Sequence, residues 1–281
     1  MSKVEYIAYP PTSFPLRDLL VLEHFPIGLD DHLCEIGVGS GATAARFARR
    51  CAHVTGFEIS ASTVDLLRYL EVRHLNLDLV VADAVNTDSL ERYQHRFTRL
   101  LSCDTLEHVT DPGAFFRTVA RLLRPGGRFF VTFPNEPQAL MHGVTRFDTP
   151  AELAEHLCAA GLREHRIGSA RLRPQAAWLI QSLGWKPLQL LHQLRARVAR
   201  ASATPAARSS TRLAAGSNPQ VFDETDFFRR YHLWRRLAPA VNLYWHGLMR
   251  VVELGGDAFE MDWEFRRKPF VCTQIVVTGS A

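Results

Sequence analysis

The chain lacks the sequence features that define several classes of protein. Its five cysteines occur singly among 281 residues and form no C-x-x-C pair, so the sequence indicates neither a zinc cage nor a disulfide framework. No apolar run approaches the length needed to span a bilayer, and the first residues, MSKVEYIAYPP, contain no apolar signal core. We therefore expect a globular protein in the reducing cytoplasm.

Acidic residues are missing from one long segment. Residues 165–222 contain no Asp or Glu but nine Lys and Arg, although the net charge of the whole chain is only +4, which is too weak to argue for nucleic acid. Within this segment, residues 199–219 are rich in Ala, Ser and Arg, and we expect them to form a mobile loop. The segment is interpreted as a helical cap with a solvated basic loop. The alternative is a lid over an amphiphilic or anionic substrate, with contact to a membrane surface or an acidic carrier.

Strand-like and helix-like stretches alternate between residues 30 and 168, as a doubly wound sheet requires. A further strand is expected at the end of the chain, which gives a seven-stranded, mostly parallel, Rossmann-like α/β sheet. Thr149 and Pro150 predict the start of a helix that Gly161 ends. The expected strands are 32–37, 53–59, 77–82, 97–103, 128–133, 162–168 and 270–278, and the expected helices are 42–50, 61–74, 111–123 and 150–160.

The stretch LCEIGVGSGAT, residues 33–43, places three glycines at alternate positions after the first expected strand. Glycines allow the backbone to turn beneath a bulky ligand, and the N–H groups at the following helix start face that ligand. Gly37, Gly39 and Ala42 can also be matched to the dinucleotide fingerprint G-x-G-x-x-G/A. Read as Glu35-x-Gly37-x-Gly39-x-Gly41, however, the stretch resembles motif I of class I S-adenosylmethionine-dependent methyltransferases. A carboxylate inside the strand suits a cofactor with an ammonium group better than one with a pyrophosphate.

Four later stretches strengthen this resemblance. VTGFEIS ends the second expected strand with Glu58, whose carboxylate can accept both ribose hydroxyls, and VVADAVN ends the third with Asp83 and Ala84, beside the expected adenine. LLSCDTLEHVTDP and ARLLRPGGRFFVTFPNE closely resemble the fourth and fifth strands of small-molecule methyltransferases, including the ubiquinone-biosynthesis O-methyltransferases. The resemblance covers residues 30–168 and implies S-adenosylmethionine as cofactor. The residues expected to bind it are Glu35, Gly37, Gly39, Gly41, Glu58, Ile59, Asp83, Ala84, Cys103 and Asp104.

A base is needed only if the methyl acceptor must lose a proton as it reacts. Histidine is the natural candidate, because its pKa lies near working pH. We expect His142 first and His108 second, since both follow strands at the edge of the sheet where ligands bind. Asp104, Glu107 and His108 could instead hold magnesium or manganese, as similar sets do in some relatives of this family. The interpretation adopted is that Glu107 and His108 only shape the loop, with no metal ligand.

The acceptor is expected to be a small apolar or amphiphilic molecule methylated on oxygen, nitrogen or carbon. Amino-directed nucleic-acid methylases usually carry N/D-P-P-Y/F after the fourth strand, where this chain reads SCDTLEH. An RNA methyltransferase and a non-catalytic methyltransferase-like binding protein are the alternatives. The expected organisation is an N-terminal cap (1–29), a cofactor-binding domain (30–168), a substrate lid or insertion (169–265) and a final strand (266–281).

Overall fold

A computed structural model describes most of the chain. The described residues are 16–39, 41–69, 76–136, 143–187, 190, 193, 243–244, 247–265, 270 and 272–281. They fall into two compact units, one formed by residues 16–173 with 257–281 and the other within residues 174–256.

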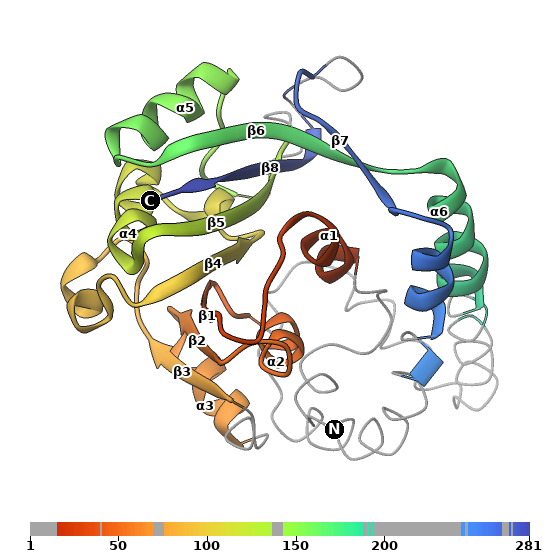
Figure 1. Ribbon diagram of the computed structural model, residues 1–281, viewed down its shortest axis with the longest axis horizontal. Helices are drawn as coiled ribbons and strands as arrows, with labels where there is room; N and C mark the ends of the chain where they lie inside the picture. Colours follow the sequence, from red (N-terminus) through yellow and green to blue (C-terminus); the bar gives the residue numbers. More distant parts are fainter. Residues whose placement is uncertain are drawn as a thin grey trace, which may run out of the picture. The chain divides into compact units, whose positions relative to one another are not determined.

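The first unit is built on one eight-stranded sheet in the order β3-β2-β1-β4-β5-β8-β6-β7 (Figure 1). The five strands from β3 to β5 are parallel, whereas β8 runs antiparallel to both of its neighbours and β7 antiparallel to β6. The strands are β1 (His32–Ile36), β2 (His53–Glu58), β3 (Leu77–Val81), β4 (Phe97–Cys103), β5 (Leu123–Asn135), β6 (Arg163–Leu172), β7 (Phe259–Asp262) and β8 (Cys272–Ser280).

This arrangement confirms the expected doubly wound α/β class, but the expected number of seven strands was wrong. The eighth strand, β7, has four residues and lies in a segment that was expected to be part of the insertion. Its sequence, FEMD, is too short to show the alternation that identifies a strand. β6 also extends to Leu172, which places residues 169–172 in the sheet.

Helices cover the sheet on both faces (Figure 1). Two of them begin as their sequences predict: the Asp111 carboxylate accepts the Ala114 N–H at 2.8 Å, and Thr149 Oγ1 accepts the Glu152 N–H at 3.2 Å. A proline follows each of these caps, at the helix position where a missing N–H costs nothing. The helices of this unit are α1 (Leu16–His24), α2 (Ala42–Phe47), α3 (Ala61–Tyr69), α4 (Pro112–Leu122) and α5 (Pro150–Ala159), with 3₁₀ turns η3 (Thr87–Tyr93) and η4 (Leu106–His108).

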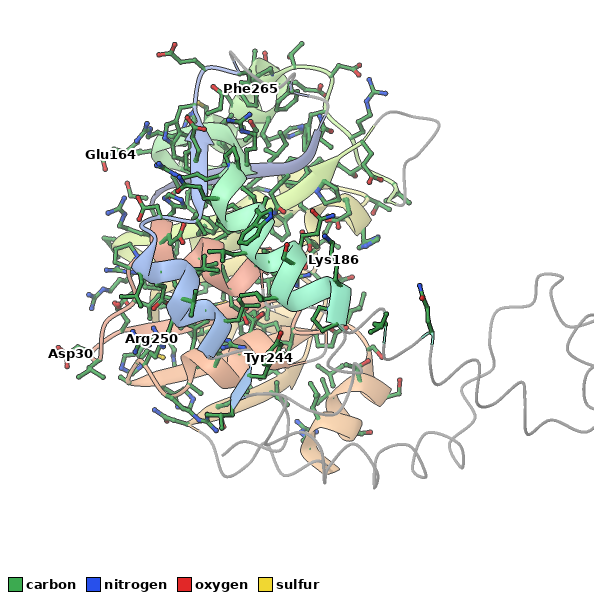
Figure 2. All side chains as sticks on the ribbon, turned by 90° about the vertical axis from the view of Figure 1, so that its right-hand side faces the viewer. Asp30, Glu164, Lys186, Tyr244, Arg250 and Phe265 are labelled. Atoms are coloured by element: carbon green, nitrogen blue, oxygen red, sulfur yellow. The ribbon has the colours of Figure 1, made fainter. Side chains whose placement is uncertain are left out.

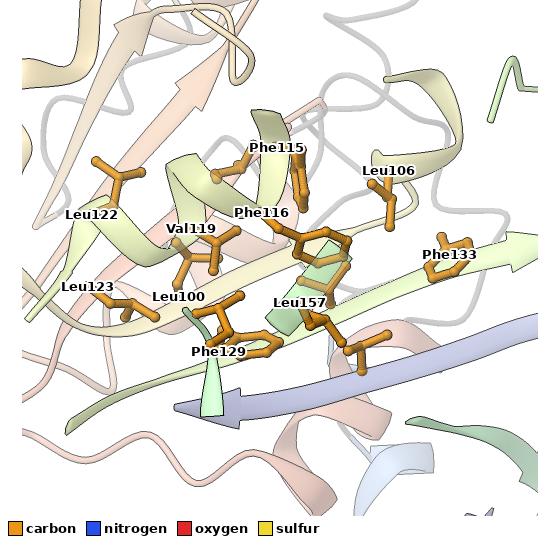
Figure 3. Close-up of a cluster of buried hydrophobic side chains, with 14 of the residues drawn as sticks. Leu100, Leu106, Phe115, Phe116, Val119, Leu122, Leu123, Phe129, Phe133 and Leu157 are labelled. Carbon is orange, nitrogen blue, oxygen red and sulfur yellow. The ribbon is translucent and has the colours of Figure 1, made fainter. Parts of the chain in front are cut away.

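The main hydrophobic core lies between the sheet and helices α4 and α5 (Figure 3). Phe116 and Val119 of α4 and Leu157 of α5 are fully buried with Leu100 of β4 and Phe129 of β5. Burial of side chains of this size stabilises the fold by about 1.5–3 kcal/mol each. The core therefore fixes the strands whose carboxyl ends carry the candidate site.

The described part of the second unit is helical. α6 (Pro174–Leu179) continues into a π-helical turn, η6 (Ile180–Trp185), and residues 247–254 form another helix beside them (Figure 2). The Tyr244 hydroxyl donates a hydrogen bond to the Leu183 carbonyl, which joins the two segments. Among the described helices, none is long and apolar enough to cross a membrane. The basic loop expected at residues 199–219 lies outside the described residues.

Candidate functional site

The glycine turn between β1 and α2 has the backbone conformation that its sequence predicts. Gly37, Gly39 and Gly41 have φ angles of +79°, +50° and +73°, in the left-handed region that favours glycine. A Cβ on Gly37 would lie 2.1 Å from Oγ1 of Thr105, so this position admits no side chain. Apart from its chain neighbours, no atom of the described residues lies within 4 Å of a Cβ built on Gly39, so the backbone there borders open space. A ligand can approach the chain closely at Gly39.

Glu58, the last residue of β2, is fixed by two backbone amides. Its Oε2 accepts the N–H of Gly39 and its Oε1 accepts the N–H of Ser60, both at 3.0 Å. Each carboxylate oxygen can accept a second hydrogen bond, because it carries two lone pairs. The side chain is therefore held beside the glycine turn with acceptor capacity on both oxygens.

Glu35, in β1, is buried with 3% of its surface exposed. Burial raises its pKa to about 8, and the nearby Asp18 and Glu58 carboxylates act in the same direction. Arg17 and a hydrogen bond from the Ala44 amide act in the opposite direction without cancelling the shift. Its Oε2 has no hydrogen-bond partner in the described structure. A buried carboxyl with an unsatisfied oxygen is costly unless a ligand completes it.

The residues after β2 and β3 lie at the same edge of the sheet. Ala82 donates its N–H to the Glu58 carbonyl at 3.0 Å, which places the start of the Asp83 loop beside the end of β2. Asp83 Oδ1 accepts the Val85 N–H at 3.0 Å, so this carboxylate orders its own turn. Ile59 is 67% exposed although it is large and apolar. An exposed apolar side chain beside a polar turn can provide one wall of a site for a flat, partly apolar group.

After β4, the chain adopts a rare backbone conformation. Asp104 has a φ of +50°, which is uncommon for a non-glycine residue but tolerated by aspartate. Its N–H donates to the Thr132 carbonyl at 2.8 Å, and its carboxylate forms an ion pair with Arg17 at 2.6 Å. Cys103, just before it, is buried, and this burial raises the pKa of its thiol well above the ordinary value. The thiol is therefore neutral and serves to pack the strand end.

Helix α1 brings two charged residues to this edge that the sequence did not single out. Arg17 pairs with Asp104, and Asp18 accepts hydrogen bonds from Thr43 Oγ1 at 2.8 Å and Arg46 Nε at 2.7 Å. Asp18 is 4% exposed and thereby anchors α1 to the start of α2. The only sequence signal was a charged Arg-Asp pair at the start of an apolar helix, which commonly means no more than a solvated helix end.

Of the two histidines expected to act as bases, the structure describes only His108. His142 lies outside the described residues. His108, in η4, is exposed, and its Nε2 lies 3.7 Å from Oε1 of Glu107. Glu107 is itself buried, and this burial raises its pKa to about 7.

Within the described part of the chain, no group of three His, Cys, Asp or Glu side chains could hold a metal ion, and Asp104 is paired with Arg17 instead.

Comparison with known proteins identifies relatives of the sheet unit. The Methyltransferase domain family matches residues 34–131. The ubiquinone biosynthesis O-methyltransferase of Aeromonas salmonicida is 30% identical over 160 residues, which cover 50% of this chain and 67% of that protein. The enzyme of the same name from Sodalis glossinidius is 28% identical over 178 residues, which cover 57% of this chain and 71% of that protein.

Two solved structures share the fold at low sequence identity. Phosphoethanolamine N-methyltransferase 2 of Haemonchus contortus has a TM-score of 0.52 and 15% identity; the match covers 95% of this chain and about half, 52%, of that one. The YcgJ protein of Bacillus subtilis has a TM-score of 0.50 and 13% identity, with coverage of 94% and 98%. At this level of identity these structures support the fold alone.

Proposed function

The chain belongs to the class I S-adenosylmethionine-dependent methyltransferases, and from that premise we propose that it methylates an oxygen of a small apolar or amphiphilic acceptor. The curated relatives, which are O-methyltransferases of ubiquinone biosynthesis, favour oxygen over nitrogen or carbon. The family match ends at residue 131, before the segment in which we expect the acceptor to bind.

The observation that carries the proposal is the pairing of an unsatisfied buried carboxyl with an open glycine turn. The orphan Oε2 of Glu35 suits the ammonium group of the cofactor, and the backbone at Gly39 leaves space for the body of the cofactor. Glu58 would accept the ribose hydroxyls with its remaining lone pairs. Arg17 would pair with the cofactor carboxylate, since its guanidinium already lies at this edge beside Asp104. When bound, S-adenosylmethionine supplies an activated methyl group on its sulfonium sulfur.

The other strand ends would complete the cofactor site. We propose that Gly37 and Gly41 hold the turn, that Ile59, Asp83 and Ala84 surround the adenine, and that Cys103 and Asp104 border the methyl-bearing end. This assignment follows from their positions at the carboxyl edge of a parallel sheet, where open α/β folds bind their ligands.

A hydroxyl acceptor must lose its proton as the methyl group arrives, and we propose a histidine as the base. His142 is the first candidate and His108 the second. The carboxylate of Glu107 near the His108 ring would stabilise the imidazolium formed when His108 takes the proton. Replacing each histidine with asparagine should lower turnover at pH 7 without changing cofactor affinity. If a magnesium or manganese ion at Asp104, Glu107 and His108 is used instead, turnover will depend on added metal and be lost with a chelator.

Binding of S-adenosylhomocysteine tests the cofactor assignment. Titration calorimetry on the full chain should show 1:1 binding that weakens at least tenfold in Glu58→Gln, since charge-assisted hydrogen bonds contribute about 1.5–3 kcal/mol. Glu155→Gln removes an exposed carboxylate on α5 and is the matched control. Unchanged affinity in Glu58→Gln would contradict the assignment.

Transfer of a labelled methyl group to amphiphilic phenols, with RNA as a parallel substrate, then separates the small-molecule proposal from the RNA alternative. Binding without any transfer would favour the non-catalytic alternative.

The second unit is proposed to meet the acceptor at an anionic membrane surface. Residues 174–256 carry eleven Lys and Arg and four Asp and Glu, a net charge of +7 against −3 for the rest of the chain. Trp178, Leu190 and Leu254 are also exposed there, at 65%, 61% and 88%. Apolar side chains on a basic unit suit a lipid interface better than an acidic carrier protein. Vesicles containing phosphatidylglycerol should bind the chain and pure phosphatidylcholine vesicles should not; equal binding to both would contradict the proposal.

We expect the protein on the cytoplasmic side, where its free Cys34, Cys51 and Cys103 stay reduced.

A further inference from the structure

A groove lined by charged side chains lies on the sheet face that α1 covers. Its volume is about 470 Å³, within the range of small-molecule sites. Phe25, at the end of α1, stacks on Phe130 of β5, and the pairing across the sheet continues from Phe130 to Thr278 and Arg166. Thr278 and Arg166 line the groove. From Phe130 of β5, the same face of the sheet therefore continues into polar residues on β8 and β6, which border the groove.

Within the groove, Trp263 packs against both Gly168 and Arg166. The Trp263 ring lies across Gly168 so closely that a Cβ on this glycine would be 2.6 Å from ring atom Cε3. On the same ring, the guanidinium carbon of Arg166 sits 4.2 Å from the centroid. Stacking fixes the guanidinium plane and leaves the N–H donors at its edge available. Arg166 is therefore positioned before any ligand arrives.

Three arginines in this groove have no ion-pair partner among the described residues. Among the residues that the structure describes, no carboxylate lies within ion-pair distance of Arg128, Arg166 or Arg173, whereas Arg171 nearby pairs with Glu260 at 3.0 Å. Guanidinium groups without an ion-pair partner offer N–H donors in the geometry that matches a carboxylate or phosphate group.

Most acidic side chains of the groove already have partners of their own. Glu23 accepts the N–H groups of Ala258 and Phe259 at 2.8 and 3.0 Å, and Glu164 lies 3.5 Å from the Ser280 hydroxyl. Asp257 is close enough to His24 to oppose the lowering of its pKa, which burial causes. Within the described part of the chain, these contacts leave the three arginines as the charged groups of the groove that have no ion pair or hydrogen bond of this kind.

We propose that this groove binds a small organic anion whose phosphate or carboxylate group is held by Arg166 with help from Arg128 and Arg173. The site is separate from the proposed cofactor site. Glu23, at the groove, and Arg17, at the cofactor edge, are six residues apart on α1, a separation of about 9 Å along the helix axis. The inference goes beyond the methyl transfer proposed above and does not depend on it.

Titration of the full chain with inorganic phosphate at constant ionic strength tests the proposal, with acetate as a second probe. We expect saturable 1:1 binding of at least one probe, weakened about tenfold or more in Arg166→Gln because charge-assisted hydrogen bonds are lost. Gly168→Ala keeps every charge but displaces Trp263, so it should weaken binding too. Arg50→Gln removes an exposed arginine in the turn after α2 and should bind like the unaltered chain.

Equal affinity in the unaltered chain and Arg166→Gln, or no saturable binding of either anion, would overturn the proposal. Preference for phosphate would identify a phosphorylated ligand, and preference for acetate a carboxylate. Thermal unfolding of each variant shows whether it is folded, so the result can be read even if S-adenosylhomocysteine does not bind. Where S-adenosylhomocysteine does bind, its affinity should be the same in all variants.

Discussion

Protonation of Glu35 gives the sharpest test of how the cofactor is recognised. Its pKa of about 8 means that the carboxyl is mostly neutral at pH 7 in the chain without ligand. If the cofactor ammonium docks against Oε2, the ionised form becomes favoured and the proton must leave. Cofactor binding should therefore release a proton, and affinity should rise with pH.

The number of protons released on cofactor binding follows from the raised pKa of Glu35. A carboxyl with a pKa near 8 is about 90% protonated at pH 7, so binding there should release roughly 0.9 protons if the bound form has a pKa below about 5. Between pH 6 and 7 the affinity should rise by nearly tenfold, the limit for one proton. Glu35→Gln has a similar shape but no proton to lose, so its affinity should be weaker and independent of pH in this range.

Calorimetry with S-adenosylhomocysteine in two buffers of different ionisation enthalpy measures the protons released directly. Measurements between pH 6 and 7.5 keep the ligand amine charged. Equal apparent enthalpies in both buffers, with binding intact, would refute the reasoning, because they would show that Glu35 does not change its protonation. Proton release that persists in Glu35→Gln would assign the effect to another group.

The same pKa shift predicts how stability depends on pH. Because the pKa of this acid is raised on folding from 4.5 to about 8, the folded chain binds more protons than the unfolded chain between these values. The free energy of unfolding should therefore fall as pH rises through this window, by at most about 1.4 kcal/mol per pH unit from this residue. Urea titrations of Glu35→Gln should lack this part of the slope.

Four further substitutions test other parts of the structure. Gly37→Ala places a Cβ 2.1 Å from Thr105 Oγ1 at a φ of +79° and should lower the free energy of unfolding by about 2–3 kcal/mol, whereas Gly39→Ala, with open space around it, should cost less; equal losses in urea titrations would contradict this. Asn135→Ala removes three buried hydrogen bonds, two of which its side-chain amide donates, and should cost about 3 kcal/mol in the same assay, while a loss under 1 kcal/mol would mean that the network is dispensable. Trp178→Ala should leave affinity for S-adenosylhomocysteine unchanged while turnover of a membrane-held acceptor falls; unchanged turnover would contradict the proposed role of this exposed residue at the membrane surface.

The sheet could be predicted from sequence because its signals are local. Apolar runs bounded by glycine, proline and polar residues mark β1 to β5, and the caps at Asp111 and Thr149 mark two helix starts. β7 could not be predicted, because a four-residue strand becomes recognisable only through its pairing with β6. The RPGG turn predicted a break between α4 and a strand starting at 128, yet β5 begins at Leu123. There the strand pairs at Leu123 with Phe97 and shifts register before Arg128, which is a tertiary effect.

The site was predictable only where it follows the ends of strands. Parallel strands end at one edge, so Glu58, Asp83 and Asp104 could be grouped from their positions alone. Arg17 could not, because its partner Asp104 is 87 residues away and the contact depends on where α1 packs. The sequence also could not predict that Oε2 of Glu35 lacks a hydrogen-bond partner, because this depends on which neighbouring side chains reach the atom in the folded chain.

In the proposed cofactor site, the two glutamates near the ends of β1 and β2 would serve two different purposes. Glu58 receives two backbone N–H groups, which hold its carboxylate beside the glycine turn and leave acceptor capacity on both oxygens. Glu35 is buried with one oxygen unpaired, so its ionised form is favoured only when a cation arrives. In the proposed cofactor site, Glu58 would accept the hydroxyl pair of the ribose, and Glu35 would pair with the ammonium group. Recognition of a cofactor that carries both groups would therefore depend on the different surroundings of the two carboxyls.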